Sequence, residues 1–236
     1  MRRRSDYPTF SDQEMASRHR QIQALMEQEN VDALLVYGTG RYSSDVYWLT
    51  DWPCSREAYV LFQNGKEPVV LMQLFNHFPM TRVMSIVKDV RWAGANTSTS
   101  VLELIRERGL ESKKIALVGA IPYQHYNRLR EQFPNAALAD LGGKLRMMRT
   151  VRSAEEIDRI RFASKLTDQS IEALAQELKE GMREDEIPAI IEPVYLKQGG
   201  YAGIHFMSSM PMRHPDFPVP SQYQSSRKLQ KADCLI

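Results

Sequence analysis

Histidine is the residue type best suited to proton transfer at neutral pH, and the chain holds five histidines. No HxxxH or HExxH spacing joins any two of them, so the usual helical zinc signature is absent. His205 and His214 stand close together in sequence, and with Asp216 they offer one conceivable zinc set. The ordinary interpretation places His205 in a strand and His214 on an exposed loop. From the residues alone we therefore predict no metal site.

Nucleophilic residues give weaker signals than the histidines. Cys54 has Arg56 nearby, which could lower the pKa of the thiol, but no pattern ties this cysteine to a base. Ser208-Ser209 lacks the G-x-S-x-G elbow of serine hydrolases. Gly38-Thr39-Gly40 follows an apolar run, but neither a third glycine nor Gly-Lys-Ser/Thr comes after it. We interpret these glycines as the end of a strand and not as a nucleotide loop.

Composition limits the class of protein. The 236 residues suffice for one large or two small domains, and 43% hydrophobic with 25% charged residues is typical of a soluble globular protein. A net charge of +2 argues against nucleic acid or an anionic membrane as a partner. No apolar run is long enough to span a bilayer, and no apolar run follows the basic residues 2–4. Two cysteines imply no disulfide framework, so we expect a cytoplasmic protein.

Residues 9 to 141 alternate predicted helices and strands, which indicates one α/β domain. Ser11 to Glu14 is a capping box that starts a helix, and residues 33–37 form an apolar run typical of a buried strand. Asn64-Gly65 between two apolar runs predicts a hairpin. Further strands are predicted at 84–87, 89–92, 115–119 and 136–141, and further helices at 101–108 and 122–133. Gly142-Gly143 is the predicted junction, which gives a domain of residues 1–142. The aromatic residues Tyr47, Trp48 and Trp52 are either core or a wall against a neighbouring subunit.

A long helix dominates the second part, residues 143–236. Ser153 with Glu156 is a second capping box, and Gly181 is a candidate C-cap. Between them an apolar stripe recurs at steps of three and four, which predicts one buried face. Its members are Ile157, Ile160, Ser164, Thr167, Ile171, Leu174 and Leu178. A second helix is expected near Glu184, a strand over residues 201–207, and a loop over residues 208–226.

Three runs of this second part resemble a known family. Residues 145–149, then 152–157 and 160–163, resemble the "R-hydrophobic-K-S-x-x-E-I-x-x-I-R-x-A" entry to the catalytic domain of the creatinase, prolidase and aminopeptidase P family. Residues 181–184 resemble its "G-x-T/S-E" run. Residues 228–236 resemble its "L-x-x-G-D-hydrophobic" turn, with Ala232 in place of glycine. In the first part, residues 45–52 resemble its "N-x-x-Y-L-T-G-F" run.

The resemblance implies a fold and an activity. It implies an α/β (α+β) architecture, in which a creatinase-like N-terminal α/β domain, residues 1–142, precedes the first, incomplete part of a pita-bread catalytic domain, residues 143–236. It implies a homodimeric metal-dependent hydrolase that cleaves Xaa-Pro peptides or a related small amide. Two divalent ions, Mn, Co or Zn, are held in that family by two Asp, one His and two Glu. All five ligands follow the turn that Asp233 matches, so we expect a chain truncated before them, with no metal ligand and no catalytic residue of its own.

A substrate-binding role remains for two histidines. In the family, a histidine upstream of the glycine-aspartate turn lines the substrate pocket. His214 is the first match for it and His205 the second, and a neutral imidazole there can donate to a developing oxyanion. The alternative is a non-catalytic pita-bread protein that serves as a binding module, since a fold does not fix a function.

Overall fold

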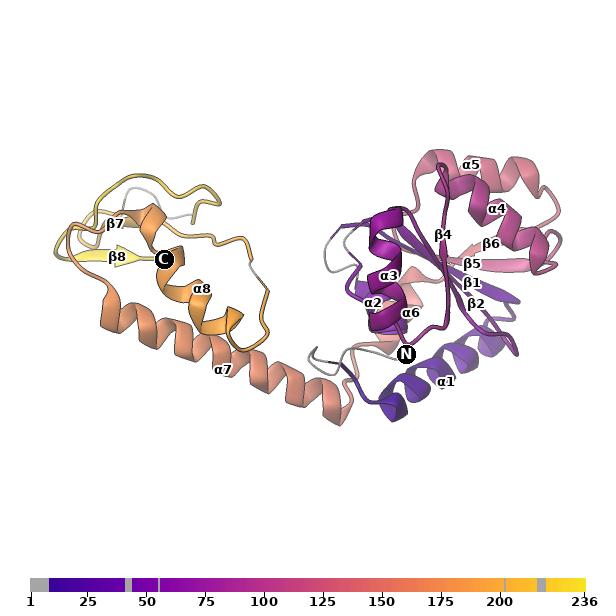
Figure 1. Ribbon diagram of the computed structural model, residues 1–236, viewed down its shortest axis with the longest axis horizontal. Helices are drawn as coiled ribbons and strands as arrows, with labels where there is room; N and C mark the ends of the chain where they lie inside the picture. The colour runs from indigo at the N-terminus through magenta and orange to yellow at the C-terminus, as the bar shows by residue number, and fades with distance from the viewer. Residues whose placement is uncertain (1–8, 41–43, 55, 202, 216–219) are drawn as a thin grey trace. The chain divides into compact units, whose positions relative to one another are not determined.

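The computed structural model describes residues 9–40, 44–54, 56–201, 203–215 and 220–236. They form two compact units, the first ending at Ser153 and the second running from Ala154 to Ile236 (Figure 1). This division lies C-terminal to the junction predicted at Gly142-Gly143. Helix α6 (Gly142–Met148) lies between the two positions, and its fully buried Leu145 belongs to the core of the first unit.

The first unit is built on a six-stranded mixed sheet of order β4-β3-β2-β1-β5-β6. Strand β2 pairs antiparallel with both β1 and β3, and the other neighbours are parallel. The predicted hairpin is confirmed, with Gly65 at φ +73° in its turn. The strands are β1 (Ala33–Gly38), β2 (Ala58–Gln63), β3 (Val69–Met72), β4 (Asp89–Trp92), β5 (Lys114–Val118) and β6 (Ala137–Asp140).

Helices cover both faces of this sheet, which confirms the α/β prediction (Figure 1). Alternate residues of β1 enter two separate cores, Leu34 on one face and Leu35 on the other. The first core takes side chains from α1 (Asp12–Gln28), α2 (Ser44–Thr50), α3 (Phe78–Met84) and α6. The second takes them from α4 (Thr97–Glu107) and α5 (Tyr123–Gln132). Ser11 caps α1 as predicted, its Oγ accepting the N–H of Glu14 at 3.1 Å.

Two predicted strands are wrong. Over residues 84–87 only Met84 lies in a regular element, as the last residue of α3, and residues 85–87 form the connection to β4. Pro79 in the first turn of α3 favours the helix to which Met84 belongs. Over residues 201–207 only Met207 pairs, in an isolated bridge with Ser221, so among the described residues of this run no strand forms. Trp48 and Trp52 are each 5% exposed and belong to the first core, which supports the core interpretation of the aromatic cluster.

The second unit contains the predicted long helix, α7 (Ala154–Glu177), followed by η2 (Glu184–Glu186) and α8 (Pro188–Leu196). A short hairpin pairs β7 (Ser209–Pro211) antiparallel with β8 (Asp233–Leu235). Helix α7 packs against α8. Its stripe is covered only near the C-terminal end, where Leu174 and Leu178 meet a small core, while Ile160 and Ile171 are 53% and 60% exposed. No described helix is long and apolar enough to cross a membrane.

One glycine of the first unit yields a sharp stability prediction. Gly119 has φ +94°, and an added Cβ would lie 2.3 Å from the carbonyl oxygen of Tyr37. Gly119→Ala is expected to lower the free energy of unfolding by about 2 kcal/mol or more, because both the backbone conformation and the contact are unfavourable. Urea unfolding measures the change.

The matched control is Gly143→Ala in α6, where no atom lies within 4 Å of the added Cβ. This change is expected to leave stability unchanged or raise it by less than about 1 kcal/mol. Equal stability of the Gly119 variant and the wild type would show that the strand end tolerates a side chain.

Candidate functional site

The candidate site lies in the second unit, where a buried carboxylate organises the loops around β7 and β8. Glu184, at the start of η2, is 5% exposed. Its Oε1 accepts the backbone N–H of Ser209 at 2.7 Å and the Oγ–H at 2.6 Å. Its Oε2 accepts the N–H of Ser225 at 3.1 Å and the Oγ–H at 2.5 Å. One carboxylate therefore joins η2 to strand β7 and to the segment that precedes β8.

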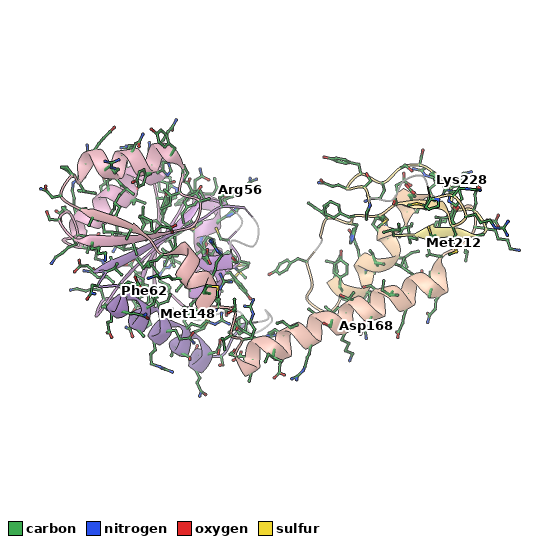
Figure 2. The ribbon with its side chains drawn as sticks, turned by 180° about the vertical axis from the view of Figure 1, so that it is seen from behind. Arg56, Phe62, Met148, Asp168, Met212 and Lys228 are labelled. Atoms are coloured by element: carbon green, nitrogen blue, oxygen red, sulfur yellow. The ribbon has the colours of Figure 1, made fainter. Side chains whose placement is uncertain are left out.

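Arg227 extends these contacts to the turn before β8. Its Nη1 donates to the Oγ of Ser209 at 2.6 Å and to Asp233 Oδ2 at 2.7 Å, and its Nη2 donates to Asp233 Oδ1 at 3.0 Å. We call Glu184, Ser209, Ser225, Arg227 and Asp233 the Glu184 network. In Figure 2, Met212 and Lys228 mark its neighbourhood: Met212 follows β7, and Lys228 pairs with Arg183. The turn aspartate identified in the sequence is thus held in place by an ion pair.

Both carboxylates of the network stay ionised at neutral pH. Burial alone would raise the pKa of Glu184, but the hydrogen bonds from Ser209 and Ser225 outweigh it, and the net pKa is lowered. Hydrogen bonds from Arg227 lower the pKa of Asp233. Two ionised carboxylates that accept hydrogen bonds from serine and arginine side chains are suited to hold the chain in position.

His205 is the titratable side chain best placed for chemistry. Its Nε2 lies 3.1 Å from Oε1 of Glu192 and 3.2 Å from the hydroxyl of Tyr195, and its carbonyl oxygen accepts the Nε2–H of Gln224 at 2.6 Å. Glu192 and Tyr195 stand three residues apart on α8, so they share one face of that helix. A carboxylate beside an imidazole fixes the orientation of the ring. The side chain of His205 is 18% exposed, so it remains accessible.

His214 stands apart from this group. It lies in the turn after β7, where its backbone N–H donates to the carbonyl of Pro211 at 3.1 Å, and it is exposed. Among the described residues, no interaction joins the imidazoles of His205 and His214. Asp216, the third member of the conceivable zinc set, lies outside the described residues. The structure therefore assembles a His205 cluster with Glu192 and Tyr195, and the pocket-lining role of the two histidines stays a prediction.

The described residues do not fit a metal centre. No group of three or more His, Cys, Asp or Glu among them is placed to hold an ion. The acidic side chains nearest the expected turn, Glu184 and Asp233, are already saturated by serine and arginine donors. The dinuclear site that the sequence resemblance implies is therefore not formed by this part of the chain.

Cys54 is not an activated nucleophile. The residue is fully buried, and its Sγ–H donates to the carbonyl of Arg56 at 2.5 Å. Burial raises the pKa of the thiol to about 11, although a backbone hydrogen bond at Arg56 acts in the opposite direction. The guanidinium of Arg56, which the sequence suggested as an activator, does not overcome this.

The comparisons with known proteins agree on one family. Residues 18–151 match the Creatinase/Prolidase N-terminal domain family. The chain is 20% identical over 222 residues to the Xaa-Pro dipeptidase of Pyrococcus horikoshii, covering 94% of this chain and 59% of that protein. It is 23% identical over 184 residues to the creatinase of a Bacillus species, covering 76% of this chain and 44% of that protein.

Solved structures show the same fold. The X-Pro aminopeptidase from Thermotoga maritima matches with a TM-score of 0.77 and 16% identity, over 92% of this chain and 59% of that one. The Xaa-Pro dipeptidase from Bacillus anthracis matches with a TM-score of 0.72 and 14% identity, over 94% and 59%. The chain thus spans about three fifths of the length of these structures, and at such low identity the likeness concerns the fold.

The lowered pKa of Glu184 predicts that the stability of the second unit depends on pH. Because the folded pKa lies below its ordinary value of 4.5, the stabilisation is present above pH 4.5 and is lost as the pH falls through the folded pKa. Amide hydrogen exchange at Ser209 and Ser225 is expected to accelerate over that range, beyond the intrinsic pH effect.

In Glu184→Gln, which loses the charged acceptor, protection at pH 7 is expected to fall by about 2 kcal/mol. Glu180→Gln, at an exposed position, is the control and should match the wild type.

The two cysteines are expected to differ in reactivity. At pH 8 the thiol of Cys54 is almost fully protonated and buried, whereas Cys234 is partly exposed. Iodoacetamide should modify Cys234 in the native protein and reach Cys54 only after unfolding. Peptide mass mapping measures both sites, and rapid native labelling of Cys54 would contradict the assigned burial.

Proposed function

Because the chain belongs to the creatinase/prolidase N-terminal domain family, we propose that it forms part of a metal-dependent hydrolase of the Xaa-Pro peptidase and creatinase type. Its substrate is a peptide or a small amide. The observation that carries this proposal is the length of chain over which the sequence similarity extends. The family match ends at Val151, but the alignment with the Xaa-Pro dipeptidase takes in 222 of the 236 residues, and so includes most of the second unit. An N-terminal domain shared by chance would not extend the likeness in this way.

In this proposal the second unit supplies a wall of the substrate pocket. His205 and His214 contact the substrate, and a neutral imidazole donates a hydrogen bond to the oxygen that gains charge as the amide is attacked. Glu192 and Tyr195 hold the ring of His205 through its Nε2. The Glu184 network holds β7, which leads to His214, at a fixed place beside the turn at Asp233.

The proposed hydrolase uses divalent ions, Mn, Co or Zn, whose ligands are contributed from outside the described residues. A homodimer in the cytoplasm completes the proposal. Because Trp48 and Trp52 are buried, these two side chains do not form an aromatic wall against the neighbouring subunit of this dimer.

A second candidate function is a binding module without catalysis. The specific observation in its favour is that the described residues offer no group able to hold a metal. Both candidates bind the same class of ligand, but only the hydrolase turns it over. Turnover is therefore the measurement that separates them.

The test uses the natural full-length gene product loaded with Mn, Co or Zn. We expect release of proline from Ala-Pro or of urea from creatine, loss of this activity on dialysis against a chelator, and its return with the metal. His214→Ala and His205→Ala should each lower kcat/KM by about 10²-fold, the usual cost of one lost oxyanion donor. His77→Ala, a histidine of the first unit, is the control and should retain full activity.

Thermal melts of the same variants separate loss of the pocket from loss of the fold. A full-length protein that binds Ala-Pro with every metal tested and never cleaves either compound would overturn the hydrolase and leave the binding module. Unchanged kcat/KM in both histidine variants would remove these two residues from the pocket.

A further inference from the structure

A cavity of about 330 Å³ lies in the first unit, where α5 passes over the ends of β5 and β6. Leu117 and Leu138 come from the two strands, Tyr126 comes from α5, and Asp140 stands at the end of β6. The loop 119–121, which joins β5 to α5, completes the lining. The volume is about ten times that of one water molecule and falls in the range of small-molecule sites.

The topology of the sheet explains why a cavity opens at this place. Strands β5 and β6 are parallel neighbours. The helix after β5, α5, packs on the face of Leu35, whereas the helix after β6, α6, packs on the face of Leu34. After β5 and after β6 the chain therefore turns toward opposite faces of the sheet. This creates a crevice between the carboxyl ends of the two strands. In open α/β sheets, such switch points are where ligands bind.

The walls of the cavity are fixed by contacts outside it. Helix α5 is tied to β2 by a 2.7 Å hydrogen bond between His125 Nδ1 and the hydroxyl of Tyr59, and its Leu129 is buried in the core. The loop is held at Gly119, whose backbone packs directly against the carbonyl of Tyr37. With the helix and the loop both anchored, the space between them does not close by a simple shift of either.

The lining defines the chemistry of an occupant. Leu117, Ile121 and Leu138 supply apolar surface, and the hydroxyl of Tyr126 and the carboxylate of Asp140 supply polarity. Asp140 Oδ1 accepts the N–H of Gly142 at 2.8 Å, which leaves carboxylate lone pairs for a ligand. No Lys, Arg or His is among the described lining residues, so a negatively charged ligand finds no cationic side chain there.

We propose that this cavity binds a small molecule with an apolar body and an amine group, the amine facing Asp140. The start of α5 at Tyr123 favours an anion instead, through its helix dipole. The charge preference of the site is therefore the property to measure.

The test titrates the ¹⁵N-labelled full chain with benzylamine, benzyl alcohol and benzoate, three probes of one shape and different charge. We expect saturable chemical-shift changes at Ala120, Ile121 and Ala139 with benzylamine, weaker binding of benzyl alcohol and none of benzoate. Asp140→Asn keeps the acceptor for Gly142 and removes the charge. It should weaken benzylamine about tenfold, as loss of a charged hydrogen-bond partner does, and leave benzyl alcohol unchanged.

Asp158→Asn, which removes an exposed carboxylate from α7, is the matched control and should bind all three probes as the wild type does. Leu138→Trp fills the cavity and should abolish binding of both neutral and charged probes. Tyr126→Phe provides a milder variant should the tryptophan prevent folding, and it should weaken benzyl alcohol. Tighter binding of benzoate, shifts confined to other residues, or equal benzylamine affinity in Asp140→Asn would each overturn the proposal.

Discussion

The carboxylate of Glu184 accepts four hydrogen bonds from Ser209 and Ser225, and the second unit depends on them because it has little else to hold it together. Among its described residues one apolar cluster has three buried members, Ile187, Met207 and Leu229, Ile190 and Met210 are buried besides, and no residue of α7, which is described throughout, is buried. An uncompensated buried charge would be costly, so the serines must stay in place. Arg227 donates hydrogen bonds to Asp233, so the position of β8 depends on the same network.

The first unit is stabilised in a different way, by apolar packing. Two apolar cores, one on each face of the sheet, contain most of its buried side chains, and polar contacts serve mainly at the ends of strands and helices. A core repeated along six strands leaves a clear pattern in sequence. A network of five polar residues spread over fifty positions leaves almost none.

The sequence predicted those parts of the fold that local patterns determine. The run at Ala33–Gly38, the hairpin around Gly65 and the cap at Ser11 were predicted because alternation, turn type and capping act over a few residues. The strand expected at 84–87 did not form, because its first residue, Met84, belongs to the helix that has Pro79 in its first turn. The strand expected at 201–207 failed because a strand needs a partner, and among the described residues only Ser221 offers one.

The candidate site was predicted less completely for the same reason. His205 was identified by type, but Glu192 and Tyr195 belong to α8, and only the spacing of three on one helix face hinted at a shared role. Glu184 was expected only to mark the start of a second helix, and its hydrogen-bond partners lie 25 and 41 residues away. Contacts of that range depend on the folded chain and not on neighbouring residues.

The bond between Tyr59 and His125 has a consequence for the form of the imidazole. Burial raises the pKa of the Tyr59 phenol, so it stays protonated and needs an acceptor. The nearest one is Nδ1 of His125 at 2.7 Å, which must then carry no hydrogen, and the ring is the tautomer protonated on Nε2. The attachment of α5 to the sheet thus depends on which ring nitrogen of His125 carries the hydrogen.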